Sequence, residues 1–185
     1  MITLYPTDTV YGLGVDATDA AAVDALFALK AREARNPVSI VVADIAMAEA
    51  YAELTPLARH LIDSFLPGKL TIVLNTKSNL APAITAGTGT VGIRIPRHPV
   101  PLRIVSELGR PLTATSANLS GLPTLRTPPE ILQQFGHLAS AVTTVIDEGE
   151  LPVSLPSTVV DARGDSLIIL REGAIPRSEF DSFNH

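Results

Sequence analysis

Short runs rich in Val, Ile and Leu alternate with longer segments of helical periodicity along most of this 185-residue chain. Apolar runs of four to eight residues are typical of buried strands, and longer segments with apolar residues three or four apart are typical of helices. Strands are expected at residues 2–5, 37–42, 70–75, 90–95, 111–115, 141–146, 157–162 and 166–170, and helices at 18–34, 45–54, 55–65, 99–108 and 127–135. The alternation predicts an α/β fold, a single domain with a mixed sheet and helices packed on it.

The last part of the chain is expected to depart from this alternation. The final two expected strands follow one another directly, with Arg163-Gly164-Asp165 between them, so they predict a hairpin. The domain is expected to cover residues 1–175. Residues 176–185 are expected to form a loosely attached C-terminal tail, because chain ends are poorly ordered unless something ties them down.

Composition excludes several classes of protein. Hydrophobic residues make up 46% of the chain and charged residues 18%, which favours a globular protein over a disordered one. The absence of cysteine excludes disulfides, thiolate zinc sites and a cysteine nucleophile. No apolar run reaches the 18 or so residues that a membrane span needs, and the first residues lack a signal-peptide pattern, so a cytoplasmic protein with no membrane partner is expected. The net charge of −5 argues against a surface that binds nucleic acid throughout.

Two patterns that suggest binding sites have simpler explanations. The stretch GTGTVG at 87–92 has the spacing of a dinucleotide-binding loop, but it precedes an expected strand, whereas that loop must open a helix. A glycine-rich turn explains it better. The four histidines, at positions 60, 98, 137 and 185, have no partner histidine at metal-ligand spacing, so packing or surface roles are expected.

Three cations, Lys30, Arg32 and Arg35, gather at the end of the first expected helix. Cations there gain about 0.3–1 kcal/mol from the helix dipole, which explains the cluster without a ligand. Cations also bind phosphate oxygens, through charge-assisted hydrogen bonds of roughly 1.5–3 kcal/mol each. The stretch TSANLSG at 115–121 adds small hydroxyl and amide groups just beyond an expected strand end, where ligands of α/β sheets commonly bind. Each pattern alone leaves both explanations open.

Taken together, these patterns resemble the YrdC-like family, the threonylcarbamoyl-AMP synthases, in a stand-alone short form. The matching pieces come in the family's order: PTDTVYGLG (6–14), KAR (30–32), NP (36–37), LPGKLTIVL (66–74), TVGIRIPRHP (90–99), SANLSG (116–121), STVVD (157–161) and LREGA (170–174). The resemblance implies a twisted open sheet around a concave, positively lined groove. It also implies a nucleotidyltransferase that joins L-threonine, bicarbonate and ATP into L-threonylcarbamoyl-AMP and releases pyrophosphate. A downstream tRNA threonylcarbamoyl transferase then modifies adenosine 37 of tRNA.

The family pattern also implies roles for individual residues. Lys30 and Arg32 are expected to be the catalytic pair and to hold the ATP phosphates. The other expected ATP contacts are Asn36, Arg94, Ser116, Asn118, Thr124 and Arg171, and the expected L-threonine contacts are Thr7, Thr9, Tyr11 and Ser157. Mg²⁺ is expected to arrive with ATP near Ser116 and Asn118, without a protein ligand cluster of its own.

The implied chemistry suits these residue types. The substrate amine captures carbon dioxide or bicarbonate, and the carbamate oxygen attacks the α-phosphorus, so positioning and charge neutralisation matter more than a protein nucleophile. No single general base is assigned. Gly12 and Gly14 are expected to let the backbone turn closely around the amino acid.

This chain departs from the family pattern in three places. The given sequence begins at the first strand, where family members often carry a preceding helix, and no additional C-terminal domain is expected. Some members also have a histidine in the strand after Asn-Pro. That strand is Val38 to Val42 here, so one expected threonine contact is missing.

Two other classes of function stay open on the sequence alone. One is a double-stranded RNA or tRNA-binding module without its own catalysis, in which Lys30, Arg32 and Arg35 form a basic stripe. The acidic net charge favours only a weak contact with tRNA, which salt would weaken further. The other is a carbamoyl-handling domain of the kind found in hydrogenase-maturation proteins. Those domains sit in longer chains with zinc motifs, and this chain has no cysteine.

Overall fold

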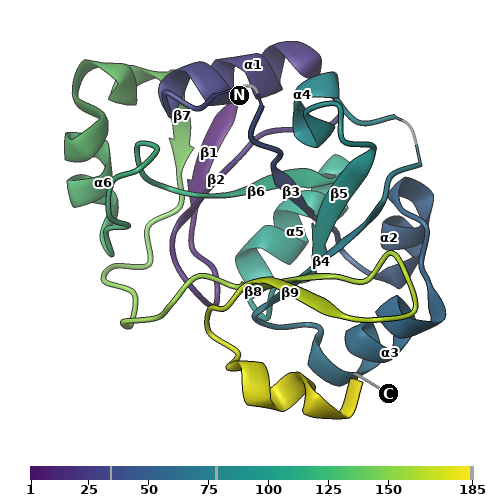
Figure 1. Ribbon diagram of the computed structural model, residues 1–185. Coiled ribbons are helices and arrows are strands. Elements are labelled where there is room, and N and C mark those ends of the chain that lie inside the picture. Colours follow the sequence, from purple (N-terminus) through teal and green to yellow (C-terminus); the bar gives the residue numbers. More distant parts are fainter. Residues whose placement is uncertain (34, 78, 184–185) are drawn as a thin grey trace.

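Nine strands form one twisted mixed sheet in the computed structural model, which describes residues 1–33, 35–77 and 79–183 (Figure 1). The strand order is β7-β1-β2-β6-β3-β5-β4-β8-β9. The strands are β1 Ile2–Tyr5, β2 Gly12–Gly14, β3 Ser39–Val41, β4 Leu70–Asn75, β5 Thr90–Arg94, β6 Leu112–Ser116, β7 Val142–Val145, β8 Thr158–Asp161 and β9 Ile168–Arg171. The pairs β1/β7, β3/β5 and β4/β8 are parallel and the others antiparallel, which confirms the predicted mixed sheet and the hairpin between β8 and β9.

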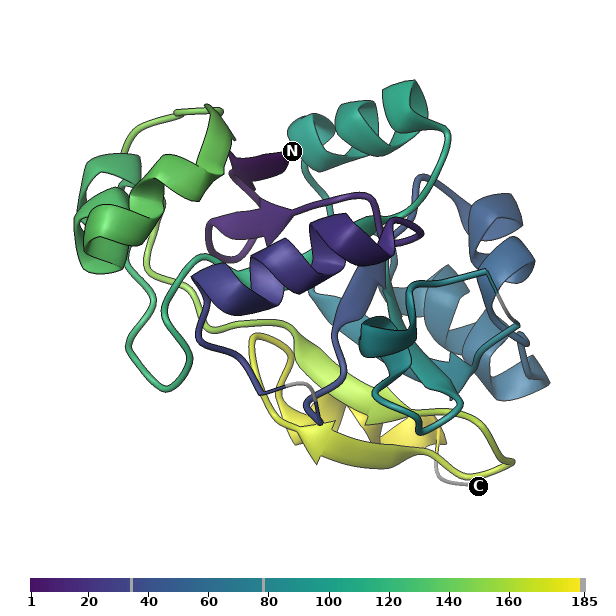
Figure 2. The same cartoon turned by 90° about the horizontal axis from the view of Figure 1, so that it is seen from above.

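The helices are α1 Ala20–Leu29, α2 Ile45–Tyr51, α3 Pro56–Phe65, α4 Pro82–Thr85, α5 Pro99–Leu108 and α6 Pro128–Phe135, with 3₁₀ segments η1 Gly136–Ala141 and η2 Arg177–Phe183. Within the described residues, every α-helix except α4 begins at a residue whose side chain caps it. Asp19, Thr55 and Thr127 each accept the backbone N–H three residues on, which is the usual N-cap bond. Seen from above, α1 lies across the middle of the domain, with α6 at one end and α2 and α3 at the other (Figure 2). No helix of the described residues is long and apolar enough to cross a membrane.

The two faces of the sheet are covered differently. On one face, buried residues of the central strands, such as Ile40, Ile72 and Ile93, join a large hydrophobic core with α1, α3 and α4. A smaller cluster lies around α5, where Val100 and Val105 pack with Tyr5, Val41 and Leu112. Residues of that second cluster also line a pocket, so the sheet has one closed face and one partly open face.

Helix α1 is shorter than predicted. The expected helix ran to about residue 34, which lies outside the described residues, but α1 ends at Leu29 with Lys30 as its C-cap. Ala31 then takes a left-handed φ of 48°, and the N–H groups of Ala31 and Arg32 bond the carbonyls of Ala28 and Phe27. This is a Schellman ending, which stops the helix and turns the chain.

The tail also differs from the expectation of loose attachment. Residues 177–183 form η2, and Phe180 is fully buried in the main core. Its ring lies 5.0 Å from that of Phe65 on α3, and the ring of Phe183 lies 4.8 Å from that of His60. Aromatic burial thus holds a segment that its position alone suggested would be free.

Candidate functional site

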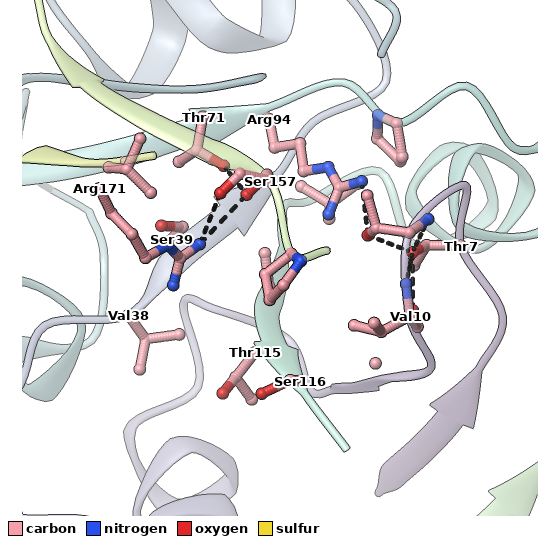
Figure 3. A pocket seen from close by; sticks show the side chains of 18 of the residues that line it. Thr7, Val10, Val38, Ser39, Thr71, Arg94, Thr115, Ser116, Ser157 and Arg171 are labelled. Carbon is pink, nitrogen blue, oxygen red and sulfur yellow. Dashed lines mark hydrogen bonds between the residues drawn. The ribbon is translucent and has the colours of Figure 1, made fainter. Parts of the chain in front are cut away.

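A pocket of about 350 Å³ opens on the same side of the sheet as α5. Its floor is made by alternate residues of the central strands, because every second side chain of a strand points to the same face. The floor residues are Ser39 and Val41 of β3, Thr71 and Val73 of β4, Thr90, Gly92 and Arg94 of β5, and Ala114 and Ser116 of β6. The loop after β1 and the segments around Ser157 and Arg171 form the walls. Figure 3 shows Arg171, Ser157 and Thr71 on one side of the pocket and Thr7 and Val10 on the other.

Strand register places a polar row across this floor. Val41 of β3 is paired with Arg94 of β5, Thr71 of β4 with Val159 of β8, and Val159 with Arg171 of β9. Side chains far apart in the chain therefore meet on one surface. Two of them are guanidinium groups, so the pocket has a cationic floor despite the chain's negative total charge.

Arg94 lies deep in the pocket and is 8% exposed. Its Nη2 donates to Asp8 Oδ1 at 2.7 Å and to Thr9 Oγ1 at 3.0 Å. Burial lowers the pKa of Arg94, and the nearby Asp8 carboxylate opposes that shift. Among the described residues nothing hydrogen-bonds its Nη1, and that atom is not one of the fully buried unpaired atoms. Arg94 therefore offers free donors to a ligand at the bottom of the pocket.

The hydroxyls of the loop after β1 are already engaged. Thr7 Oγ1 donates to the carbonyl of Val10 at 2.7 Å and accepts the N–H groups of Thr9 and Val10. The Thr9 hydroxyl therefore donates to Thr7, 3.0 Å away, and accepts from Arg94. Thr7 and Thr9 line the pocket as predicted, but their hydroxyls hold the loop and Arg94 in place.

The Tyr11 hydroxyl is engaged in a similar way. It donates to the carbonyl of Gly149 at 2.8 Å and accepts the N–H of Glu148 at 3.1 Å. This phenol anchors the 147–149 segment, and the residue lines the pocket.

The glycines Gly12 and Gly14 lie in a strand and do not form the turn that was expected. A Cβ on Gly12 would lie 2.9 Å from Cζ of Tyr5, and one on Gly14 would lie 2.7 Å from Cε1 of the same ring. Their lack of a side chain makes room for Tyr5, whose hydroxyl donates to the carbonyl of Thr113 at 3.0 Å. Both glycines thus allow the buried Tyr5 ring to pack against the backbone of β2.

Arg171 and Ser157 form the opposite wall. Arg171 Nη2 donates to the Ser157 carbonyl at 2.8 Å, and the Ser157 hydroxyl lies 2.8 Å from that of Thr71. Partial burial lowers the pKa of Arg171, and so does the positive charge of Arg94. Both guanidinium groups line the pocket, and their positive charge favours an anion there.

The Lys30 ammonium does not line the pocket. It is 2% exposed and donates to the carbonyls of Ser116, at 2.5 Å, and Asn118, at 2.6 Å. Burial, helped by the charge of Arg32, lowers the pKa of Lys30 to about 7. Lys30 therefore holds the 116–118 loop, which makes the end of β6 part of the site.

Arg32 points to the pocket from the other side of the Schellman turn. Its Nε donates to the carbonyl of Asn36 at 3.1 Å and its Nη2 to that of Pro37 at 2.7 Å. The guanidinium also lies 5.7 Å from the ring centre of Phe27, within cation–π range. Asn36 contributes its carbonyl to this arrangement.

Ser116 lines the pocket, and its hydroxyl donates to Asn118 Oδ1 at 2.5 Å. The Asn118 amide nitrogen donates to the carbonyls of Leu119 and Leu122. Asn118 therefore shapes the loop that presents Ser116. Thr124 lies in a separate pocket of about 120 Å³, which shares Thr9 and Val10 with the larger one.

The structure thus gathers most, but not all, of the predicted residues. Those that line the main pocket are Thr7, Thr9, Tyr11, Arg32, Arg94, Ser116, Ser157 and Arg171, and those that do not are Lys30, Asn36, Asn118 and Thr124. The prediction missed Asp8, Ser39, Thr71 and Gly92. Two of them had a signal in the sequence, because Ser39 and Thr71 are polar residues within apolar strands. In the part of the chain that the structure describes, no three His, Asp or Glu side chains are grouped to hold a metal.

Comparisons with known proteins agree with this geometry. The family model Sua5/YciO/YrdC, whose description reads "Telomere recombination", matches residues 1–173. The threonylcarbamoyl-AMP synthase of Bacillus subtilis is 36% identical over 98% of this chain and 52% of its own length. The one from Photobacterium profundum is 34% identical over 91% of this chain and 90% of its own.

A solved structure, Sua5 of Pyrococcus abyssi in complex with L-threonine, superposes with a TM-score of 0.91. It is 35% identical, and the match covers 98% of this chain and 53% of that one. The chain therefore spans about half the length of the Bacillus and Pyrococcus relatives and most of the Photobacterium one.

Proposed function

The chain belongs to the Sua5/YciO/YrdC family, and on that basis we propose that it is an L-threonylcarbamoyladenylate synthase. This nucleotidyltransferase would join L-threonine, bicarbonate and ATP and release pyrophosphate. The observation that carries the proposal is the deep Arg94, with free donors, in a pocket whose rim holds two further guanidinium groups. A small carboxylate at the bottom and a polyphosphate at the rim match that distribution of charge.

The amino-acid subsite is proposed around Arg94. A carboxylate can accept two hydrogen bonds from a guanidinium, and the unpaired Nη1 faces the pocket. Asp8 and Thr9 hold Nη2, so the planar group is oriented before a ligand binds. The same fold in Pyrococcus abyssi was solved with L-threonine bound, which supports an amino-acid ligand. Arg94 is accordingly proposed as a threonine contact and not as the ATP contact expected from the sequence.

The ATP phosphates are proposed to lie between Arg32, Ser116 and Arg171. Arg32 and Arg171 are more exposed than Arg94 and lie on different walls, so a chain of phosphates can bridge them. Lys30 is proposed to act indirectly, because its ammonium donates hydrogen bonds to two carbonyls of the loop that carries Ser116. The catalytic pair proposed from the sequence therefore divides into one phosphate ligand and one residue that builds the phosphate loop.

Magnesium is proposed to enter with the nucleotide. The Ser116 hydroxyl lines the pocket and is a hard oxygen donor of the kind Mg²⁺ accepts. The Asn118 amide oxygen lies behind it and accepts its hydrogen bond, and neither group carries a charge. Such a donor set fits an ion that already has phosphate and water ligands. The ion would supply charge neutralisation on the phosphates.

The chemistry needs little covalent help from the chain. The α-amino group of threonine and bicarbonate form a carbamate with loss of water. A carbamate oxygen then attacks the α-phosphorus, and the bond to the β-phosphate breaks as pyrophosphate leaves. The groups near the pocket supply positive charge and position, which are the main contributions in phosphoryl-type transfer. Arg94 and Arg171, which both line the pocket, would bring the carbamate and the α-phosphate together.

The product implies partners that the structure does not contain. A mixed anhydride of this kind is proposed to pass to a tRNA threonylcarbamoyl transferase in the cytoplasm. Direct contact with tRNA is proposed to be weak, because the net charge is −5, and to weaken further as salt rises.

A pyrophosphate-release assay tests the proposal. Release is expected only when ATP, magnesium, bicarbonate and L-threonine are all present, and each is omitted in turn. Equal release without threonine, or release of inorganic phosphate instead, would refute it.

The same assay tests the phosphate subsite. Arg32→Ala is expected to lower kcat/KM for ATP by roughly 10- to 150-fold, the equivalent of one lost charge-assisted hydrogen bond. Arg35→Ala is the matched control, since Arg35 is exposed and pairs only with Glu33 among the described residues. An Arg32→Ala enzyme as active as Arg35→Ala would remove Arg32 from the site.

A further inference from the structure

The floor of the pocket carries a hydroxyl without a partner. Ser39 lies on β3 and lines the pocket, and no described residue hydrogen-bonds its Oγ. That atom is also absent from the fully buried unpaired atoms, so it faces the pocket space. The other floor hydroxyls of β4 and β5 are paired, Thr71 with Ser157 and Thr90 with Thr88. Ser39 is thus free to bond a ligand.

The position of Ser39 relative to Arg94 fits a small amino acid. Ser39 and Val41 point to the same face of β3, and Val41 is paired with Arg94 on the next strand. Ser39 and Arg94 also line the same pocket, so an amino acid whose carboxylate binds Arg94 can direct its side chain toward Ser39. Val41 would then contact the substrate's apolar atoms.

Gly92 keeps the Ser39 hydroxyl in this place. A Cβ built on Gly92 would overlap Ser39 Oγ and would come within 3.0 Å of Thr71 Cγ2. Any larger residue on β5 at this point would push the Ser39 side chain aside. The absence of a side chain at Gly92 therefore leaves room for the Ser39 hydroxyl at the pocket floor.

We propose that Ser39 is a specificity-determining residue that hydrogen-bonds the side-chain hydroxyl of the amino-acid substrate, an inference that rests on the proposed function. Arg94 would bind the carboxylate of threonine, Val41 would contact its methyl group, and Ser39 would hydrogen-bond its hydroxyl. Valine has the shape of threonine with a methyl group in place of the hydroxyl, so the pair isolates the contribution of Ser39.

The test compares kcat/KM for L-threonine and L-valine in pyrophosphate release. The native enzyme is expected to prefer threonine, and Ser39→Ala is expected to reduce the threonine-to-valine ratio by about 3- to 10-fold, as one neutral hydrogen bond is lost. The KM for ATP is expected to stay the same. Ser64→Ala is the matched control, because it makes the same change on α3, outside the pocket, and its ratio is expected to match the native one.

Each outcome decides the matter. An unchanged ratio in Ser39→Ala, an equal loss for both amino acids, or a higher KM for ATP alone would overturn the role of Ser39. If the native enzyme releases pyrophosphate without any amino acid, the proposed function fails first and this inference with it. Isothermal titration calorimetry measures the binding of each amino acid to Ser39→Ala. A folded variant still binds both amino acids, so this measurement separates a loss of recognition from a loss of folding.

Discussion

Arg94 is held by a single carboxylate in a place that water hardly reaches. Asp8 and Arg94 are each about 10% exposed at their side chains, and their contact is 2.7 Å. Asp8 Oδ2 and Arg94 Nε are buried without a partner among the described residues. A buried pair with unpaired atoms contributes little net stability, although losing one partner is costly. Its evident use is to orient Arg94.

Asp8→Asn tests that use. The amide keeps the shape but removes the charge and leaves the buried Arg94 uncompensated, so the variant is expected to lose about 3–5 kcal/mol of unfolding free energy. The KM for threonine is expected to rise while the KM for ATP stays the same. Urea unfolding and steady-state kinetics measure both. Asp24→Asn, an exposed change on α1, is the control. A variant with native KM for threonine would leave Asp8 a purely structural residue.

Lys30 predicts a dependence of stability on pH. The unfolded lysine has a pKa near 10.5 and the folded one a pKa of about 7. Between these values the unfolded state binds the extra proton, so the unfolding free energy should rise with pH from about 7 upward. The slope attributable to Lys30 is at most about 1.4 kcal/mol per pH unit.

The measurement is urea unfolding at pH 7, 8 and 9 for the native protein and for Lys30→Met. Methionine keeps the length of the side chain and cannot titrate, so the difference between the two proteins isolates this group. If the unfolding free energies of the native protein and of Lys30→Met change in parallel with pH, the pKa of Lys30 is not lowered. A loss of stability in Lys30→Met is expected in any case, since two carbonyls lose their donor.

At the scale of elements, the end of α1 decides where the two site cations point. The Schellman turn places Lys30 in the last helical conformation and Arg32 beyond the turn, so they reach different loops. Ala31 adopts a left-handed backbone conformation in this turn, which costs an L-residue about 1–2 kcal/mol. Ala31, the middle residue of the Lys30-Ala31-Arg32 motif, therefore serves the backbone turn and is not one of the residues that line the pocket.

Ala31→Gly is expected to raise the unfolding free energy by about 0.5–1 kcal/mol, because glycine removes the left-handed cost but adds freedom to the unfolded chain. Activity is expected to change less than about twofold, since the turn's two hydrogen bonds remain. Ala28→Gly, three residues earlier inside the same helix, should instead lose about 1 kcal/mol. Thermal unfolding of the two variants gives the sign. Equal destabilisation by both would show that Ala31 is not strained.

For the molecule as a whole, local patterns predicted the elements and long-range pairing did not follow from them. Helix caps at Thr55 and Thr127 and the apolar strands were predictable because the signals lie within a few residues. Strand β2 was missed because it is three residues long and contains two glycines, which are poor strand formers.

The site shows the same division. The residue types of the pocket were predictable, but which hydroxyls are free was not. Thr7 and Tyr11 looked available in the sequence and are bonded to Val10 and Gly149. Ser39 looked like part of a buried strand and is free. The Tyr11 bond joins residues 138 apart in the sequence, and the surroundings of Ser39 depend on strand register, so no local pattern contains either of them.

The strand order has a consequence for biosynthesis. β1 is sandwiched between β2 and β7, and the pocket spans from Tyr5 to Arg171. At about 5–20 residues per second, the ribosome delivers the last of these residues roughly ten to thirty seconds after the first. Until then the nascent chain holds apolar strands that lack their neighbours. The complete pocket can form only when translation has passed β9, so an interrupted chain would expose aggregation-prone strand edges and lack part of the pocket.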